Sequence, residues 1–226
     1  MKRSDINRYL NDAKELFAKY GFKLPPFAFW SAGDWETKGS DADEIRSRRL
    51  GWDITDFREG RFLEMGLTLF TIRNGRIDDP SNRKMYAEKI MVVREGQVTP
   101  FHFHWMKTED IINRGGGELV VELHQADKDE KMTDQPVRVS TDGVVREVKA
   151  GGSVTLKPGE SITLVPYVYH KFYGKKGAGT CMIGEVSSVN DDATDNRFFD
   201  PLPRYPGVEE DASPVHLLCN QYPPAR

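Results

Sequence analysis

Short β-type segments separated by turn residues fill most of the chain from residue 61 onward, and they limit the fold more than any other feature. Dipeptides such as Asn74-Gly75 and Asp142-Gly143 lie between them, and no long helical pattern interrupts them. Short strands at this spacing are typical of a sandwich or barrel rather than a parallel sheet. We therefore predict a mainly β fold in a single domain over residues 1–226, with strands at residues 62–73, 86–94, 97–104, 109–113, 118–125, 137–140, 144–148, 153–156, 161–173 and 180–188.

Two segments of different composition flank the β-rich core, which we place at residues 61–190. In the N-terminal arm, residues 1–60, apolar side chains recur at three- and four-residue steps over residues 4–20. This spacing predicts an amphipathic helix with Ser4 as its N-cap, and a second, short helix is expected at residues 42–49.

The C-terminal segment, residues 191–226, is polar at first, then aromatic, and then contains six prolines. A proline-rich segment without apolar periodicity predicts an extended tail that wraps on the barrel. The acidic run Glu209, Glu210 and Asp211 is interpreted as a solvated surface.

Composition excludes several classes of function. A formal net charge of -3 and a sequence pI near 6.0 give no basic stripe, so no nucleic-acid partner is expected. Cys181 and Cys219 are too few for a disulfide framework and are interpreted as buried thiols in a reducing compartment. No apolar segment follows Lys2 and Arg3, and no run of about 18 apolar residues occurs, so we expect no membrane segment and a cytoplasmic protein.

Histidines and a glutamate have the spacing of a metal site. His102 and His104 are two residues apart on a β-type segment, so their side chains leave the same face of the strand. Glu109 opens the next segment and can lie opposite them, and His170 is on a later segment that can lie beside the first in a barrel. We therefore predict one divalent metal ion held by His102, His104, Glu109 and His170. His124 and His216 lack a partner pattern and are interpreted as structural.

This pattern resembles the two motifs of the cupin superfamily. The first motif (glycine, His-x-His, glutamate, glycine) is matched in full by Gly96, His102, His104, Glu109 and Gly116. The second is matched in part by Gly159, Pro166 and His170, with Val168 where a glycine is usual. The resemblance implies a cupin-type jelly-roll β-barrel, and His170 as the fourth ligand.

Within the cupins, nearly the whole chain resembles the D-lyxose isomerase family. The similarity includes Leu24-Pro25-Pro26-Phe27, the strand Pro100 to His104 with Lys107-Thr108-Glu109, and the segment Gly184 to Asp192. It implies a homodimer, Mn2+ as the usual ion with Co2+, Fe2+, Ni2+ or Zn2+ as alternatives, and interconversion of D-lyxose with D-xylulose. Interconversion of D-mannose with D-fructose is often a second activity that the resemblance implies.

Such an ion would leave two adjacent positions open for O1 and O2 of an open-chain sugar and would polarise the carbonyl as a Lewis acid. Lys107 is a candidate acid or base. We expect it on the same inward face as Glu109, where the neighbouring cation would lower its pKa. The alternative is an exposed lysine in a turn. Glu185, in an apolar segment, is a second candidate, or else a carboxylate that faces solvent.

Candidates for contacts with the sugar are aromatic and polar. Trp30 and Trp52 either cover a face of the sugar or seal the barrel. Asp191, Asp192 and Arg197 could bind sugar hydroxyls. The chain has no Gly-rich loop that leads into a helix, which favours a free sugar over a sugar phosphate.

Two other classes of function share this ligand set. A dioxygenase or decarboxylase would use the open metal position for O2 or another substrate, and a non-catalytic cupin would bind a sugar without turnover. Lys107 and Glu185 favour the isomerase, because proton transfer needs such groups and O2 chemistry does not.

Overall fold

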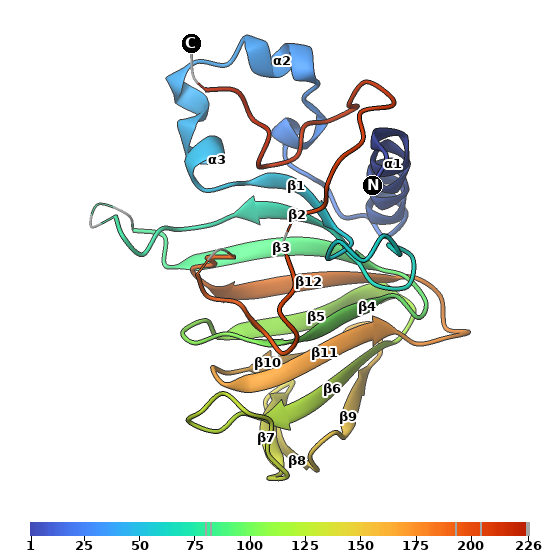
Figure 1. The fold of residues 1–226 in the computed structure, drawn as a ribbon, viewed down its shortest axis with the longest axis vertical. Coiled ribbons are helices and arrows are strands. Elements are labelled where there is room, and N and C mark those ends of the chain that lie inside the picture. Colours follow the sequence, from blue (N-terminus) through green and yellow to red (C-terminus); the bar gives the residue numbers. More distant parts are fainter. Residues whose placement is uncertain (80, 82, 193, 204, 225–226) are drawn as a thin grey trace.

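The computed structural model describes all residues except 80, 82, 193, 204, 225 and 226. Three helices and two short 3-10 turns precede a first strand, and twelve further strands follow (Figure 1). The helices are α1 (Arg3–Lys19), α2 (Ala32–Glu36) and α3 (Asp43–Ser47), with 3-10 turns at Pro26–Phe29 and Ser40–Ala42. The strands are β1 (Gly51–Thr55), β2 (Leu67–Arg73), β3 (Tyr86–Val93), β4 (Val98–Phe103), β5 (Glu109–Gly116), β6 (Leu119–Gln125), β7 (Val137–Thr141), β8 (Val144–Val148), β9 (Ser153–Leu156), β10 (Ser161–Leu164), β11 (Val168–Gly174), β12 (Cys181–Ser188) and β13 (Arg197–Phe198).

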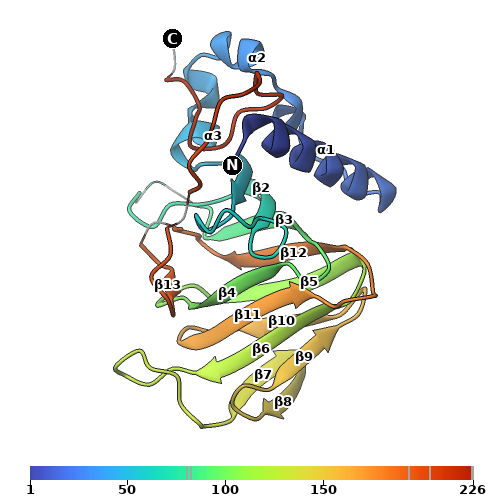
Figure 2. The same cartoon turned by 45° about the vertical axis from the view of Figure 1, so that its right-hand side comes forward.

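The strands form two antiparallel sheets that enclose the main core (Figure 2). The larger sheet has the order β1-β2-β3-β12-β5-β10-β7-β8, and the smaller has the order β13-β4-β11-β6-β9. The core between them contains Leu69, Met91 and Ile183 from the larger sheet and Leu123 and Phe172 from the smaller. The predicted mainly β, cupin-type barrel is therefore confirmed.

A second core lies on the outer face of the larger sheet. On β3, Met91 and Val93 face the barrel interior, while Ile90 and Val92 pack toward the buried face of α1. Both faces of this part of β3 are covered, which is why residues 90–93 are continuously apolar rather than alternating. The amphipathic pattern of α1 is confirmed, since Ile6, Leu10, Ala13 and Phe17 are buried there.

Three local predictions need correction. Helix α1 begins at Arg3 with Lys2 as N-cap, and Ser4 instead bonds to Asp211. The expected strand 161–173 is two strands in different sheets, because the chain changes sheet at Pro166 and Tyr167, where Tyr167 has φ 62°. Strand β1 was missed within the predicted N-terminal arm, because five residues with two polar side chains give too weak a pattern.

The C-terminal tail runs back across the edge of the larger sheet and lies among α1, α2 and α3 (Figure 1). Its acidic run is exposed, as predicted, but it also makes specific contacts with α1. Glu210 accepts hydrogen bonds from Nε and Nη2 of Arg3 at 2.8 and 2.6 Å, although the Arg3 side chain is only 1% exposed. Asp211 accepts from the backbone N–H and the hydroxyl of Ser4. These contacts attach the tail to the first turn of α1.

Replacing Glu210 with glutamine should destabilise the fold, because it removes the counter-charge of a buried guanidinium. Since Glu210 itself is exposed, we expect a loss of only about 1 kcal/mol in the free energy of unfolding, measured in urea. Arg3 lowers the pKa of Glu210 from its ordinary 4.5, so the contribution is present at neutral pH and disappears as pH falls through the lowered folded-state pKa. Equal stability of Glu210→Gln and the exposed neighbour control Glu209→Gln would contradict the role of this ion pair.

The cysteine prediction agrees with the structure, since Cys181 and Cys219 are buried and are not joined in a disulfide. Among the residues that the structure describes, none of the helices has the length and apolar character needed to span a membrane.

Candidate metal centre

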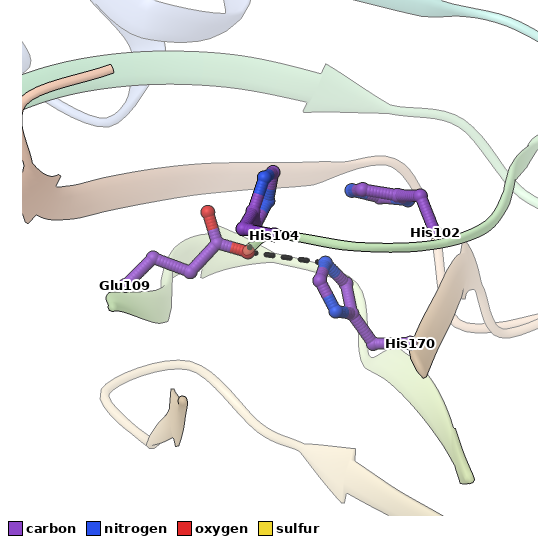
Figure 3. A group of neighbouring side chains, drawn as sticks. All are labelled: His102, His104, Glu109 and His170. Atoms are coloured by element: carbon purple, nitrogen blue, oxygen red, sulfur yellow. Dashed lines mark ion pairs between the residues drawn. The ribbon is translucent and has the colours of Figure 1, made fainter. Parts of the chain in front are cut away.

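Four predicted ligands come together from three strands of the barrel. His102 lies on β4, His104 directly follows that strand, and Glu109 is the first residue of β5. His170 lies on β11 in register with His102, because β4 and β11 are antiparallel neighbours in the smaller sheet. Figure 3 shows the four side chains converging, and their ligand atoms all lie within 4.8 Å of one another. All four residues are buried.

The three imidazoles are oriented by backbone carbonyl groups. Nδ1 of His102 donates to the carbonyl of Pro100 at 2.8 Å, that of His104 to Asp195 at 2.6 Å, and that of His170 to Val168 at 3.0 Å. Because a carbonyl can only accept, Nδ1 carries the proton in each ring, and each Nε2 presents a lone pair. Nε2 of His104 and of His170 is buried without a hydrogen-bond partner. This is the arrangement expected of ligands to a metal ion.

The charge of the cluster also fits a divalent cation. Burial, and then the neighbouring histidines, hold the pKa of His102 well below its ordinary value. Burial and the nearby Lys107 lower the pKa of His104. His102 and His104 are therefore neutral at pH 7. Oε1 of Glu109 lies 3.1 Å from Nε2 of His170 and 3.5 Å from Nε2 of His104, so one carboxylate oxygen lies among the ring nitrogens. Three imidazole nitrogens and one carboxylate suit a divalent first-row ion.

Lys107 and Glu185 lie beside this cluster and contact each other. Nζ of Lys107 lies 2.6 Å from Oε2 of Glu109 and donates to Oε1 of Glu185 at 3.0 Å. Both residues are nearly fully buried, so neither is the exposed residue of the alternative interpretation. Burial would lower the pKa of Lys107, but attraction to Glu109 and Glu185 outweighs it and the pKa is raised. Within the protein alone, Lys107 is therefore an ammonium group, not the lysine of lowered pKa that the sequence predicted.

A second buried lysine was missed by the sequence analysis. Lys89 on β3 lies opposite Glu185 of β12, and its Nζ is 3.2 Å from Oε1 of Glu185 and 3.6 Å from Oδ1 of Asp192. Asn190 accepts from both lysines, at 2.7 Å from Lys89 and 3.3 Å from Lys107. A signal was available, because Lys89 shares the inward face of β3 with Met91 and Val93.

Next to the cluster is a small pocket of about 50 Å³, which is lined by both polar and apolar side chains. The polar residues that line it include Lys89, Lys107, Glu185, Asp192 and Asn196. The apolar residues that line it include Leu69, Met91, Ile111, Phe57 and Phe198. The rings of Phe57 and Phe198 meet edge to face at 5.6 Å, and Phe198 also lies 5.3 Å from the His102 ring. Aromatic side chains thus lie against the metal ligands and reduce their contact with water.

The other predicted sugar contacts are not gathered here. Trp30 is not among the described residues that line this pocket; it packs on Trp35 and under Lys38. Trp52 is buried in the outer core, where its indole donates to the carbonyl of Ala28. Trp52 lies on β1 with its side chain on the outer face of the larger sheet, and Trp30 contacts Phe27, which packs against the same outer core. Neither side chain therefore reaches the barrel interior.

Asp191 and Arg197 lie close to the site, but their side chains contact residues outside the pocket. Asp191 accepts from Thr194 and lines a neighbouring hollow of about 590 Å³, whereas Asp192 lines both spaces. Arg197 bonds to Glu130 at 2.8 Å. It points away from the pocket because Phe198, the next residue of β13, points toward it.

Nearly the whole chain is similar in sequence to known proteins. A sequence model of the D-lyxose isomerase family matches residues 1–222. The chain belongs to the D-lyxose isomerase family. Relatives in this family include the D-lyxose/D-mannose isomerases of Serratia proteamaculans and Escherichia coli O157:H7. Each is 48% identical over 223 residues, which is 98% of this chain and 98% of the relative. The family predicted from the sequence is confirmed.

Solved structures extend the comparison of folds beyond the D-lyxose isomerase family. The L-ribose isomerases of Cellulomonas parahominis and Geodermatophilus obscurus superpose with TM-scores of 0.57 and 0.59 at 16% and 15% identity. Each alignment covers 92% of this chain and 98% of the other. At this identity the similarity shows a common fold.

Proposed function

We propose that this chain is a metal-dependent aldose-ketose isomerase that interconverts D-lyxose with D-xylulose and, less efficiently, D-mannose with D-fructose. The observation that carries the proposal is the buried cluster of three histidines and Glu109, which is linked through Lys107 to Glu185. Membership of the D-lyxose isomerase family and the two relatives at 48% identity support the choice of sugars.

We propose the ene-diol route, in which a proton leaves one of the carbons C1 and C2 and a proton is added to the other, while a proton also moves between O1 and O2. We assign the carbon proton to Glu185, a carboxylate held between two ammonium groups and aimed into the pocket. We assign the oxygen proton to Lys107, because its ammonium group lies between Glu109 and Glu185 and lines the same pocket. Glu185 accepts the proton on one side of the reaction and returns it on the other.

The four ligands would hold the ion, which supplies Lewis acidity toward the two sugar oxygens. Lys107 also fixes Glu109, since it binds Oε2 while Oε1 faces the histidines. We propose Mn2+ as the usual ion, a homodimer as the assembly and the cytoplasm as the location, all from the family resemblance. The assignment of Asp191 to sugar binding stays a prediction, and Asp192 and Asn196 are better placed because they line the pocket.

The lining of the pocket favours a free sugar. Its described residues include no arginine, and each of its two lysines is already paired with carboxylates. A phosphate group would therefore find no uncommitted cation there.

The proposal is tested by incubating the Mn2+-loaded protein with D-lyxose, D-mannose, D-xylose and D-mannose 6-phosphate, measuring ketose and dissolved oxygen together. We expect ketose from D-lyxose first, then from D-mannose, with no oxygen consumed. Oxygen uptake that depends on added substrate, without any ketose, would replace the isomerase with a dioxygenase. Tight sugar binding without turnover would indicate the non-catalytic alternative.

A further inference from the structure

Asp195, in the segment that precedes β13, accepts four hydrogen bonds, and the three to its side chain have no part in the steps above. Its Oδ1 accepts from the backbone N–H groups of Trp105 and Met106 at 2.8 and 3.0 Å, and its Oδ2 accepts from that of Lys107 at 2.9 Å. Its own carbonyl accepts from Nδ1 of His104 at 2.6 Å. Asp195 is only 3% exposed, so these contacts are made away from water.

The three N–H groups belong to the turn between β4 and β5, which is the connection between the histidine strand and Glu109. Successive N–H groups that point at one carboxylate fix the path of the backbone through the turn. That path aims the Lys107 side chain inward, where it reaches Glu109 and Glu185. Without a common acceptor, these N–H groups would be left unsatisfied in a partly buried turn.

The contact with His104 links the same residue to the metal ligands. A carbonyl on Nδ1 sets both the tautomer and the plane of the ring, so the position of Asp195 decides where Nε2 of His104 points. Asp195 therefore has two contacts with the site. Its backbone carbonyl orients His104, and its side chain holds the turn that contains Lys107.

We propose that Asp195 is a positioning residue for this site: it holds the turn that aims Lys107 and orients the ring of His104. The inference rests on the proposed isomerase function for its effect on turnover, but its effects on the turn and on metal binding do not depend on the sugar.

Asp195→Asn is the informative change, because asparagine has the same shape but only one accepting oxygen. In either orientation of the amide, an –NH2 group must face at least one backbone N–H that now binds a carboxylate oxygen. Asp200→Asn is the matched control, since Asp200 lies in the same tail, is exposed and undergoes the same chemical change.

Three measurements test the role of Asp195. We expect kcat for D-lyxose to fall by about 10- to 100-fold with KM changed less than about threefold, since the turn and not the sugar contacts is disturbed. Amide hydrogen exchange of metal-free protein should accelerate at Trp105, Met106 and Lys107 but not at Val121 in the barrel core. Calorimetric titration should show weaker Mn2+ binding, by up to about 10-fold.

Turnover of Asp195→Asn within twofold of the Asp200→Asn control would overturn the proposal, as would exchange accelerated equally throughout the barrel, which marks a general structural role. If Asp195→Asn does not fold, Asp195→Glu is the second variant, because it keeps all the accepting oxygens on a longer side chain. It should fold with lowered kcat and unchanged KM, and a wild-type kcat would overturn the proposal.

If the wild-type protein converts no aldose, the proposed function fails, and hydrogen exchange and Mn2+ affinity then decide the role of Asp195. Local acceleration of exchange together with weaker Mn2+ binding supports that role, and unchanged values refute it.

Discussion

Replacement of Glu185 with glutamine should lower kcat for D-lyxose by about 10²- to 10⁴-fold, because glutamine cannot accept or return a carbon proton. The amide has the shape of the carboxylate and can still accept from Lys107 and Lys89, now at 3.0 and 3.2 Å. We therefore expect KM and metal content to stay close to their wild-type values. Initial rates of ketose formation, with metal analysis of the same sample, measure this prediction.

The matched control is Glu122→Gln on β6. Glu122 is also an ion-paired strand glutamate, 2.6 Å from Lys171, but it is not among the residues that line the pocket. Its replacement should leave kcat within about twofold. If Glu185→Gln kept more than about a tenth of the wild-type kcat, Glu185 could not be the group that moves the carbon proton.

Replacement of His170 with alanine should abolish stable metal binding, and with it activity. His170 is 1% exposed, and its Nε2 has no hydrogen-bond partner, so the ring has no evident role other than as a ligand and as part of the packing. We expect Mn2+ affinity to fall by more than about 100-fold, since loss of a direct ligand costs more than the 10- to 100-fold typical of an outer-shell partner. Equilibrium dialysis against Mn2+, followed by metal analysis, gives this affinity.

His124→Ala is the control for lost histidine packing. His124 lies on β6, the strand next to β11, and is in register with Tyr169, the neighbour of His170. It contacts Phe101 but none of the four ligands is among its ring contacts, so its variant should bind Mn2+ as the wild type does. Unchanged affinity in His170→Ala, or an equal loss in both variants, would show that His170 is not a ligand.

Most of the candidate metal cluster was predictable from the sequence because its geometry is local. The two-residue step from His102 to His104 places both rings on one face of a strand, and a single turn brings Glu109 opposite them. His170 needed the pairing of β11 with β4, which no local pattern encodes; the partial second cupin motif supplied it. The main strands were predictable for the same reason, since turn residues and alternation are local signals.

The rest of the site depends on contacts between distant segments. Lys89, Asn190 and Asp195 act through partners in the site that lie at least 83 residues away along the chain. A single sequence does not reveal such pairs. Trp30, a predicted sugar contact, is absent from the described lining of the pocket for the same reason, because only the packing of the N-terminal arm decides where it lies. The raised pKa of Lys107 likewise follows from two carboxylates that the fold brings to it.

The most direct test of metal-dependent isomerisation is the conversion of D-lyxose to D-xylulose by protein stripped with EDTA, followed during titration with Mn2+. We predict no conversion by the stripped protein and a rate that rises with added Mn2+ and saturates at about one ion per chain, the capacity of a single four-ligand cluster. Conversion by the metal-free protein at the rate of the reloaded protein would contradict the assignment of the reaction to this centre.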